Sequence, residues 1–582
     1  MDKSFTVVTA TSLQQFLGSW GYGNPRELAQ QLQQILPKPD KNQSWSISSQ
    51  PSQKGLLAAL SASGLPSDLE FTTTSPDVWA RTEENCLILG RKAFGRVTLY
   101  WLQLNEVIWF ASRLQLLLPL VNSPKVNLAA MYGYSCFSYV PTPLTPVTGI
   151  AAIPAGIEKT WEIDGSGNIL PPRTHNLINW QENNHQISDE QVAVSQLQTL
   201  LKAAIERQIT DIDDEPVGVM LSGGLDSSIV AALLVQAGVK VRGYTLNLGD
   251  SSIPEYPYAE KVAQWLDIPL ITVDATPKQV KPALIPTIQA LDLPFGDGVC
   301  VPLFLLHQAA SRDTRIIFNG EGGDQLFAGW TNKPLIAASI YQGEHPEGSI
   351  SFEEQYLRTF HRLYGYEAQV FQSEVYEQIK HLSPQNWLYP ALESSSNPSL
   401  LHRLRRASLM LKGAQNIQPR ATNLAFAHGL HVRSPFCDLP LAQWTFQLSG
   451  ELCLQGACEK YILKRAVESW LPPEIVWRRK RGMGVPLTPW CLQDFWYSLG
   501  MWLNPGILQA EGRWYGNLAA KIVRGDLGGM ITGRRIGEIF WLLIVWQLWR
   551  VHVLGESTEN FSWNHPFWIP YAVWRLGKKL TQ

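Results

Sequence analysis

A short glycine- and serine-rich stretch, SGGLDSS (residues 222–228), combines residue types that can bind an anion and a metal ion. It follows an apolar run that predicts a β-strand over residues 217–221, and an apolar helical pattern follows it. At such a junction the unpaired backbone N–H groups of the first helical turn face the ligand, which favours phosphate. A carboxylate such as Asp226 is unfavourable beside phosphate unless a divalent cation lies between them. The stretch therefore predicts a site for phosphate together with Mg²⁺.

Three familiar patterns do not fit this stretch. A Walker A loop needs a lysine directly before its Ser/Thr, whereas Asp226 stands before Ser227. A dinucleotide-binding loop needs separated glycines, whereas Gly223 and Gly224 are adjacent, and a nucleophile elbow needs G-x-S-x-G. What remains is a loop whose N–H groups and serine hydroxyls can hold a pyrophosphate while its carboxylate holds the metal.

A second glycine loop with an acid, NGEGGDQLFAGW (residues 319–330), follows another predicted strand. Asp324 in this loop is the expected partner of Asp226 as a metal ligand. Two such loops suit enzymes that cleave ATP between the α and β phosphates. The alternative for Asp226 is a cap of the following helix, a frequent use of aspartate.

Alternating strand and helix patterns position both loops. The predicted strands are residues 217–221, 239–246, 270–273 and 314–318, and the predicted helices are 228–237, 258–266 and a stretch around 282–291. This alternation predicts right-handed crossovers and a parallel, doubly wound α/β sheet, on which ligands bind beyond the carboxyl ends of the strands. Both loops leave strands at that edge. Beyond residue 330 the sequence is mostly helical in character.

The composition narrows the class of protein. The chain has 582 residues, 45% hydrophobic and 17% charged, which predicts more than one packed domain. A net charge of −2 without a strong basic patch argues against a nucleic-acid partner. Seven scattered cysteines without CxxC pairs, and no signal-peptide pattern, predict reduced thiols in a cytoplasmic protein. The apolar run IFWLLIVWQLW (residues 539–549) is shorter than the ~20 residues of a membrane span, so we expect a buried helix and no transmembrane segment.

The stretch SGGLDSS resembles the PP-loop of the ATP-pyrophosphatases. Together with NGEGGDQLFAGW it resembles the synthetase domain of the asparagine synthetase family, whose relatives include the β-lactam synthetases and the lasso-peptide cyclases. The similarity continues through LDLPFGDGVCVPLFLL (291–306), LHVRSPFCDLPL (430–441) and EKYILKRAVESWLPPEIVWRRKRGMGVP (459–486). It thus covers most of residues 195–500.

This resemblance implies ATP as a substrate, Mg²⁺ as a cofactor, and roles for individual residues. Asp226 and Asp324 would hold the metal, Glu321 would lie by the adenylated carboxylate, and Lys480 would neutralise charge during acyl transfer. The alternative for Glu321 is an ordinary acid in a loop, and the alternative for Lys480 is a place in a solvated basic run, RRKR. Lys460 is a further candidate that could instead be structural. The implied ATP- and pyrophosphate-binding residues are Leu221, Ser222, Gly223, Gly224, Asp226, Ser227, Leu246 and Gly320.

The N-terminal part, up to about residue 169, is rich in strand-like runs and glycine breaks. ILGRKAFGRVTLYW, WFASRLQLLL and YVPTPLTPVTGIAAIPAG resemble the later part of the family's glutaminase domain, an Ntn-type α+β fold. That domain uses an N-terminal cysteine, and this sequence starts Met-Asp-Lys-Ser, with Cys86 and Cys136 internal. We therefore expect a degenerate glutaminase-like domain (1–170), a polar linker (171–194) and a PP-loop synthetase domain with a largely helical C-terminal part (195–582).

The expected function is an ATP-dependent ligase that adenylates a carboxylate and passes the acyl group to ammonia or a substrate amine, with AMP and pyrophosphate released. Two alternatives remain: an intramolecular amide ligase of the lasso-cyclase or β-lactam-synthetase type, and a non-catalytic binding scaffold. The carboxylate substrate, the amine source and the oligomeric state are not determined by the sequence. An aromatic and basic segment, residues 564–580, is expected to pack on the domain, with a membrane or peptide contact as the alternative.

Overall fold

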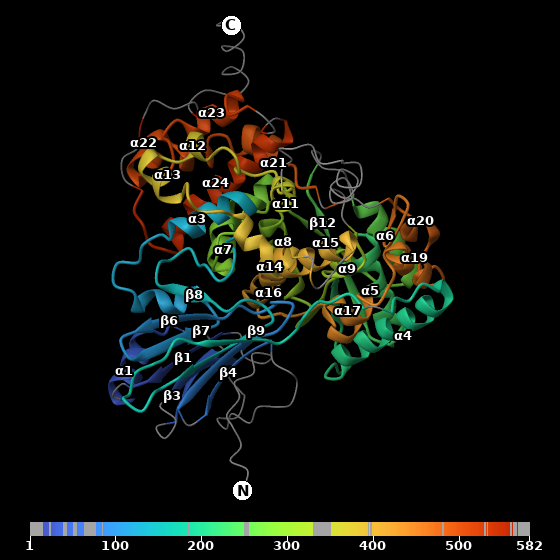
Figure 1. Ribbon diagram of the computed structural model, residues 1–582. Helices are drawn as coiled ribbons and strands as arrows, with labels where there is room; N and C mark the ends of the chain where they lie inside the picture. The colour runs from blue at the N-terminus through green and yellow to red at the C-terminus, as the bar shows by residue number, and fades with distance from the viewer. Residues whose placement is uncertain are drawn as a thin grey trace, which may run out of the picture. The chain divides into compact units, whose positions relative to one another are not determined.

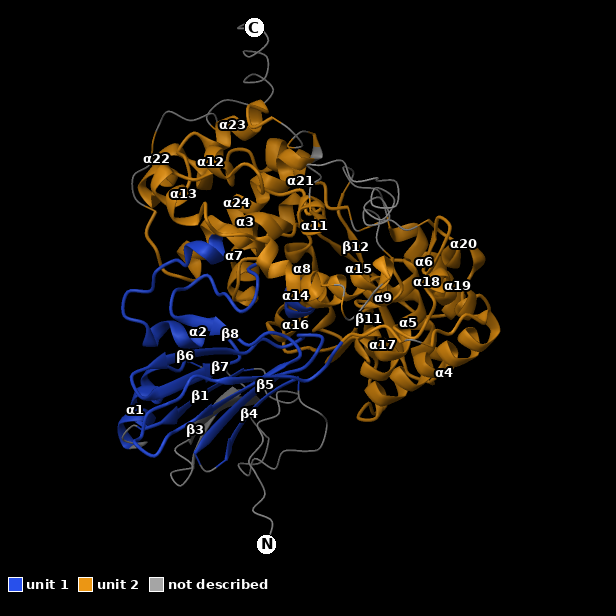
Figure 2. Ribbon diagram, viewed as in Figure 1, with its two compact units in different colours: residues 1–131, 140–179, 414–419 blue, residues 132–139, 180–413, 420–582 orange. Residues whose placement is uncertain are grey.

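The computed structural model describes most of the chain: residues 15–22, 25–38, 43–50, 55–62, 77–83, 85–183, 185–249, 255–329, 351–393, 395, 399–479, 482, 484–528, 531, 533–558, 562 and 567. The chain forms two compact units (Figure 2). Unit 1 contains residues 1–131, 140–179 and 414–419, and unit 2 contains residues 132–139, 180–413 and 420–582. The predicted domain boundaries stay a prediction; the stretch expected as a linker carries a strand at residues 173–176 and the start of a helix at Glu190.

Unit 1 is built on two antiparallel sheets, as its strand-like sequence predicted (Figure 1). The six-stranded sheet has the order β2-β3-β1-β7-β6-β8, and the four-stranded sheet has the order β10-β9-β5-β4. An Ntn-type fold for this unit stays a prediction. The strands and helices are β1 (Gln15–Gly21), α1 (Pro25–Ile35), β2 (Gln43–Gln50), β3 (Gly55–Ala62), β4 (Val78–Glu83), β5 (Cys86–Arg91), β6 (Tyr100–Leu104), β7 (Val107–Ala111), α2 (Leu114–Leu117), β8 (Ile150–Ala152), β9 (Ile157–Glu162) and β10 (Arg173–Asn176).

The segment GRKAFGRV of unit 1 (residues 90–97) has a structural role. Arg91 is fully buried at the end of β5, and its guanidinium donates hydrogen bonds to the carbonyls of Gly95 (2.7 Å), Val97 (2.7 Å) and Ile153 (3.1 Å). Burial lowers the pKa of Arg91 to about 10, so the side chain still carries its charge at neutral pH. This arginine therefore fixes the turn after β5 and holds it on the segment that follows β8.

Unit 2 contains the predicted parallel sheet, in the order β13-β12-β11-β14-β15, and every pair of neighbouring strands in it is parallel. The predicted strands are confirmed to within two residues at either end: β11 (Val217–Met220), β12 (Val241–Asn247), β13 (Leu270–Asp274) and β14 (Ile316–Phe318). A fifth strand, β15 (His431–Arg433), lies at the edge. The alternating helices are α4 (Glu190–Ile209), α5 (Leu225–Gln236), α6 (Tyr256–Leu266), α7 (Pro277–Leu291) and α8 (Cys300–Ala310). The α/β class is confirmed.

After residue 330 unit 2 is mostly helical, as expected. The elements are α9 (Gly323–Leu326), α11 (Phe352–Arg358), α12 (Glu367–Val370), α13 (Ser373–Ile379), α14 (Gln385–Leu392), α15 (Leu400–Ser408), a π-helical segment (Leu409–Ile417), α16 (Gln418–Phe426), α17 (Leu439–Thr445), α18 (Gly450–Cys453), the hairpin β16 (Leu454–Gln455) and β17 (Cys458–Glu459), α19 (Tyr461–Val467), α20 (Pro473–Val476), α21 (Leu487–Pro489), α22 (Pro505–Glu511), α23 (Leu518–Arg524) and α24 (Arg534–His552). Helix α3 (Leu128–Phe137) ends in this unit.

Helix α24 contains the apolar run that predicted a buried helix, and the prediction is confirmed. Every residue from Ile539 to Trp549 is at most 1% exposed. Among the helices of the described residues, none is sufficiently long and apolar to cross a membrane. The expected packing of residues 564–580 lies outside the described residues apart from Phe567, whose buried ring contacts Trp496 at a centroid distance of 4.8 Å.

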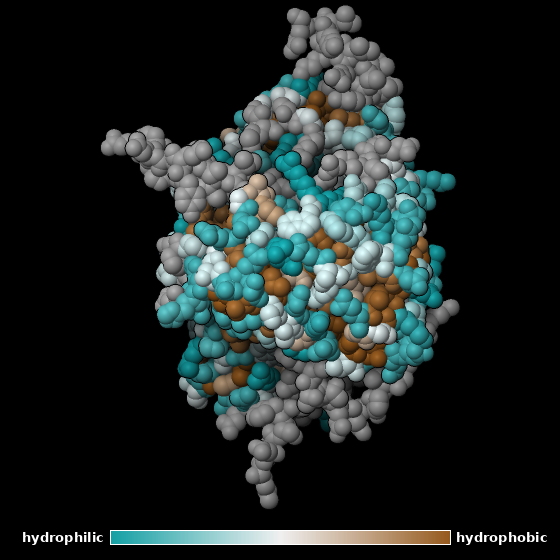
Figure 3. Space-filling model, turned by 90° about the vertical axis from the view of Figure 1, so that its right-hand side faces the viewer, coloured by the Kyte–Doolittle hydropathy of each residue, from teal (hydrophilic) through white to brown (hydrophobic). Residues whose placement is uncertain are grey.

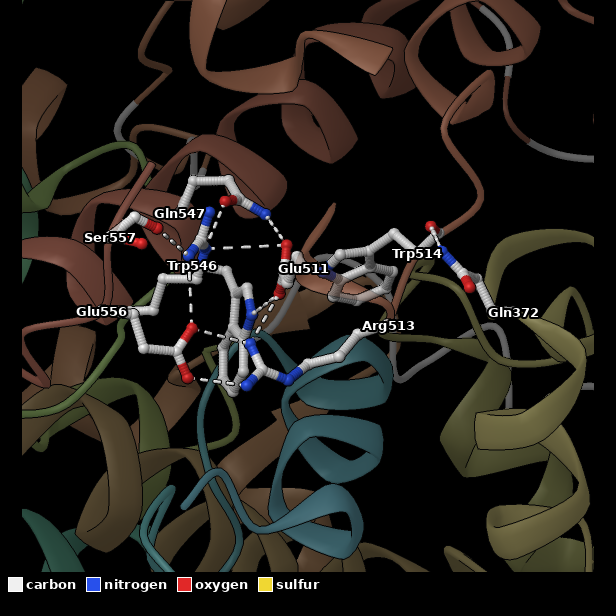
Figure 4. A network of polar contacts seen from close by, with 9 residues as sticks. Gln372, Glu511, Arg513, Trp514, Trp546, Gln547, Glu556 and Ser557 are labelled. Carbon is white, nitrogen blue, oxygen red and sulfur yellow. Dashed lines mark hydrogen bonds and ion pairs between the residues drawn. The ribbon is translucent and has the colours of Figure 1, made fainter. Parts of the chain in front are cut away.

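A buried polar network joins α22, α24 and the chain after α24 (Figure 4). The Glu511 side chain is fully buried and accepts hydrogen bonds from Arg513 (3.1 Å), Trp546 (3.3 Å) and Gln547 (2.5 Å). The Arg513 guanidinium also donates to both carboxylate oxygens of Glu556, at 2.6 and 2.9 Å. Because two glutamates here face arginine side chains, their charges are paired inside the helical part of the unit.

Candidate active site

The PP-loop (residues 221–228) joins β11 to α5 and takes a shape that requires glycine. The Leu221 N–H continues the strand pairing by donating to the Tyr244 carbonyl at 2.8 Å. Gly223 has a φ of +66°, which residues with a side chain rarely adopt. A Cβ atom at Gly223 would lie 2.4 Å from both the Ala259 nitrogen and the Tyr258 carbonyl carbon. The loop therefore packs tightly against the start of α6, and only glycine fits there.

Serine hydroxyls brace the PP-loop from within. The Gly224 N–H donates to Ser222 Oγ (3.2 Å), and Ser222 Oγ lies 3.2 Å from Ser227 Oγ. Ser227 and Ser228 donate to the Gly224 carbonyl at 3.1 and 2.8 Å. Gly224 is the N-cap of α5, no side chain caps this helix, and Asp226 lies inside its first turn, so the alternative of a capping aspartate is wrong. The helix start keeps its N–H groups available for an anion.

The second loop lies beside the PP-loop because β14 pairs in parallel with β11, through Gly218↔Ile317 and Val219↔Phe318. Its glycines make the close approach possible. A Cβ atom at Gly320 would lie 2.7 Å from the Ser227 nitrogen, and one at Gly323 would lie 2.4 Å from Asp226 Oδ1. The predicted residues of the two loops, more than ninety positions apart in sequence, are thus brought together at the carboxyl edge of the sheet.

Lys460 lies between the two aspartates. Its Nζ is 2.5 Å from Asp226 Oδ2 and 2.6 Å from Asp324 Oδ1, and its side chain is 3% exposed. Burial by itself lowers the pKa of Lys460, but the two carboxylates outweigh it and raise the pKa above the ordinary lysine value. The lysine is therefore charged, and it forms ion pairs with both of the aspartates that the sequence predicted to act together.

The two aspartates also fit a shared divalent cation. One ammonium nitrogen reaches an oxygen of each, so the two carboxylates are close enough to share an ion. Asp226 Oδ1 is buried and has no hydrogen-bond partner among the described residues. Among the described residues, no group of three or more His, Cys, Asp or Glu side chains is arranged so that it could hold a metal ion. Asp226 and Asp324 would therefore hold a Mg²⁺ ion together with phosphate oxygens and water, which this ion commonly keeps as ligands.

A second charged group, Asp297–Arg420–Glu321, lies on the other side of the second loop. Arg420 donates to Asp297 Oδ2 at 3.0 Å, and its NH2 nitrogen lies 3.8 Å from Glu321 Oε1. Burial lowers the pKa of Arg420, but its electrostatic interactions with Cys300 and with the carboxylates of Asp297 and Glu321 outweigh burial and raise the pKa overall. The Glu321 side chain remains 34% exposed, so its carboxylate is held by a buried cation and still accessible to a substrate.

A family model named Asparagine synthase matches residues 196–550, which include the PP-loop, the second loop, Lys460 and Arg420. The chain belongs to the asparagine synthase family. It is 23% identical over 437 residues to asparagine synthetase [glutamine-hydrolyzing] 1 of Bacillus subtilis, a match that covers 71% of this chain and 67% of that protein. It is also 23% identical over 467 residues to a putative asparagine synthetase of Mycobacterium bovis, covering 74% of this chain and 69% of the relative.

Solved structures similar to this asparagine synthase family member include two smaller enzymes. The NMN synthetase of Francisella tularensis is 15% identical, with 42% of this chain and 94% of that chain covered and a TM-score of 0.19. An NH3-dependent NAD synthetase of Campylobacter jejuni is 14% identical, with 34% and 96% covered and the same TM-score.

The residues predicted to border adenosine lie on neighbouring strands of the family member's sheet. Leu221 follows β11 and is 1% exposed, and Leu246 lies in β12 and is 8% exposed. Gly320 is the second residue of the loop after β14, and β14 pairs with β11 on the side opposite to β12. The three thus surround the carboxyl end of the sheet's middle strand. Lys480, the predicted acyl-transfer lysine, lies outside the described residues.

An arginine that the sequence interpretation overlooked reaches the PP-loop from the segment after α20. The Arg478 guanidinium lies 3.4 Å above the centre of the Tyr258 ring, and its NH1 donates to the Gly223 carbonyl at 3.4 Å. The face turned to the viewer in Figure 3 mixes hydrophilic and hydrophobic side chains. Trp265 in α6 and Trp477 directly after α20 are 57% and 40% exposed. Arg478 therefore adds a positive charge beside the loop at a partly open surface.

Three residues of the site, Lys460, Asp297 and Arg420, had weak or no signals in the sequence. Lys460 is 234 positions from Asp226, and Arg420 is 123 positions from Asp297, so no local spacing links them. Lys460 has φ +58° and ψ +31°, an uncommon conformation for a residue with a side chain, at the sharp change from the β16–β17 hairpin to α19. The sequence feature that could have indicated Lys460 is its place as a charged residue directly between a short hairpin and a helix.

Proposed function

We propose that this protein is an ATP-dependent ligase that adenylates a carboxylate and forms an amide from the acyl-adenylate. The observation that carries the proposal is the meeting of Asp226 and Asp324, each on a glycine loop, beside the braced PP-loop at the carboxyl edge of the parallel sheet. Membership of the asparagine synthase family supports the same reaction class. A purely binding scaffold would have no use for two acids paired around a buried lysine at an anion-binding loop.

In the proposed first step, a carboxylate oxygen of the substrate bonds to the α-phosphorus of ATP, and the bond to the β-phosphate oxygen breaks. The PP-loop N–H groups and the hydroxyls of Ser222 and Ser227 hold the pyrophosphate that leaves. Asp226 and Asp324 hold Mg²⁺, which supplies positive charge to the phosphate oxygens. Leu221 and Leu246 cover the adenosine, and Arg478 adds charge at the PP-loop.

In the proposed second step, an amine attacks the acyl carbon, AMP leaves, and one proton is released. Glu321 is placed by Arg420 and is exposed enough to orient the acyl-adenylate or to receive the amine's proton. Lys480 would stabilise the negative charge that develops during attack. The amine is ammonia or belongs to the substrate itself; the second case would make the enzyme an intramolecular amide ligase.

ATP–pyrophosphate exchange tests the proposal directly. Purified full-length protein, Mg²⁺, ATP and labelled pyrophosphate are mixed with a panel of amino-acid and peptide carboxylates, and incorporation of label into ATP is measured. We expect exchange only with the correct carboxylate and only with Mg²⁺, and AMP release when an amine is added. Exchange that is absent across the panel, with nucleotide binding intact, would favour the scaffold.

We further propose that the N-terminal part of the chain, residues 1–170, supplies no ammonia from glutamine. Cys136 is fully buried, and burial raises the pKa of its thiol well above the ordinary value, which keeps it protonated and unreactive. Cys86, in β5, is only partly exposed. Parallel reactions with ammonium, glutamine and no added amine distinguish the sources: glutamate release matched to amide formation would contradict this part and leave the ligase reaction standing.

A further inference from the structure

Lys460 lies between the two carboxylates, Asp226 and Asp324, that would share a divalent cation. Its Nζ makes ion pairs of 2.5 and 2.6 Å with the two carboxylates. The fold makes room for this lysine: a Cβ atom at Gly329 would lie 2.0 Å from Lys460 Cε and 2.3 Å from Asp324 Oδ1. The left-handed backbone of Lys460 directs the buried side chain inward from the start of α19. The lysine is thus a built part of the metal site.

We propose that Lys460 excludes a free divalent cation from the Asp226–Asp324 pair and admits the cation only together with phosphate. The inference rests on the proposed function, which assigns the two aspartates to Mg²⁺. A bare divalent ion would share a buried space with the ammonium group, and repulsion between two cations is strong where water is scarce. An ion that arrives bound to a triphosphate or pyrophosphate brings negative oxygens, with which the ammonium group can pair in turn. Metal binding is thereby coupled to nucleotide binding.

The chain offers a matched control in Lys464, one turn further along α19. Its side chain is 6% exposed, comparable to that of Lys460, but its Nζ lies 3.6 Å from Glu459 and 3.7 Å from Cys458 Sγ. Its ammonium group also lies 5.9 Å from the centre of the Trp477 ring. Replacement of Lys464 removes a buried lysine from the same helix without changing the charge between the two aspartates.

The test measures binding of Mn²⁺, an EPR-visible substitute for Mg²⁺, to full-length protein without nucleotide. We expect Lys460→Met to bind bare Mn²⁺ at least about tenfold more tightly than wild type, because a like charge has been removed. Lys464→Met and the charge-keeping Lys460→Arg should both bind it as weakly as wild type does. Equal affinity of wild type and Lys460→Met for bare Mn²⁺ would overturn the proposal.

A second measurement adds pyrophosphate and needs no variant. Wild-type protein should gain a bound Mn²⁺ signal with pyrophosphate that it lacks with Mn²⁺ alone, and the gain should be smaller in Lys460→Met. Wild-type protein that binds Mn²⁺ equally well with and without pyrophosphate would overturn the role of Lys460 even if the variant does not fold, and would leave the ligase function intact. Absence of bound Mn²⁺ under every condition would instead overturn the metal assignment on which both proposals rest.

Discussion

The Gly323→Ala substitution tests whether the position of the Asp226 carboxylate matters for adenylation. A Cβ atom at Gly323 would lie 2.4 Å from Asp226 Oδ1, whereas an ordinary contact begins at 3.4 Å. Gly323 lies in the first turn of α9, outside the glycines with positive φ, so the added methyl group acts through this contact and not through backbone strain. The carboxylate or the loop must therefore move by about 1 Å.

A displacement of about 1 Å at a group that positions reacting atoms costs roughly a hundredfold in rate. We expect Gly323→Ala to lower Mg²⁺-dependent ATP–pyrophosphate exchange by about that factor, with a loss of about 1–3 kcal/mol in the free energy of unfolding from overpacking. The assay is the exchange reaction, with circular dichroism and urea unfolding run in parallel. The matched control is Gly165→Ala in unit 1, where an added Cβ meets nothing within 4 Å, and exchange should not change.

An exchange rate at the wild-type level in a folded Gly323→Ala protein would refute the reasoning. It would mean that the Asp226 carboxylate either tolerates the displacement or does not hold the metal. A loss of exchange in Gly165→Ala as well would show that the assay reports general instability and not the geometry of the site.

Four further predictions concern the metal, acyl transfer and stability. Asp324→Asn should abolish Mg²⁺-dependent pyrophosphate release while the circular dichroism spectrum is unchanged; normal release would remove Asp324 from the metal site. Lys480→Ala should keep ATP–pyrophosphate exchange but form amide about 10²–10³-fold more slowly, and wild-type amide formation would leave Lys480 in a solvated basic run. Glu511→Gln should lower the free energy of unfolding by about 1–3 kcal/mol in urea, because Arg513 then loses one of its two acidic partners and keeps only Glu556; an unchanged free energy of unfolding would contradict this. Burial opposes ionisation of Glu556, but Arg513 and Arg550, which both donate hydrogen bonds to its carboxylate, hold its pKa below the ordinary value. The ionised Glu556 side chain thus contributes fully to the free energy of unfolding above its unfolded-state pKa of about 4.3, and this contribution is lost as pH falls through the folded-state pKa. We therefore expect the free energy of unfolding of Glu556→Gln to decrease less in acid than that of wild type.

Local sequence patterns were sufficient to predict the strands and helices that position the site. The strands before both loops and the helices between them were predicted because apolar periodicity and glycine breaks are local properties of the chain. The rule that parallel strands end at one edge then predicted that Asp226 would meet Asp324. The start of α5 was placed three residues late, at residue 228 instead of Leu225, because Gly224 caps the helix through its backbone, and no capping side chain marked the start.

Tertiary structure alone decided which charges surround those two acids. Lys460 reaches them from a hairpin–helix turn 234 positions after Asp226, and Arg420 joins Asp297 to Glu321 across 123 positions. Neither contact can be predicted from sequence spacing, because each depends on how helices that are distant in the sequence pack around the sheet. Electrostatic energy falls with distance in space and not in sequence. The sequence therefore determined the phosphate loop and its acids, and the packing of distant helices determined the cations that neutralise them.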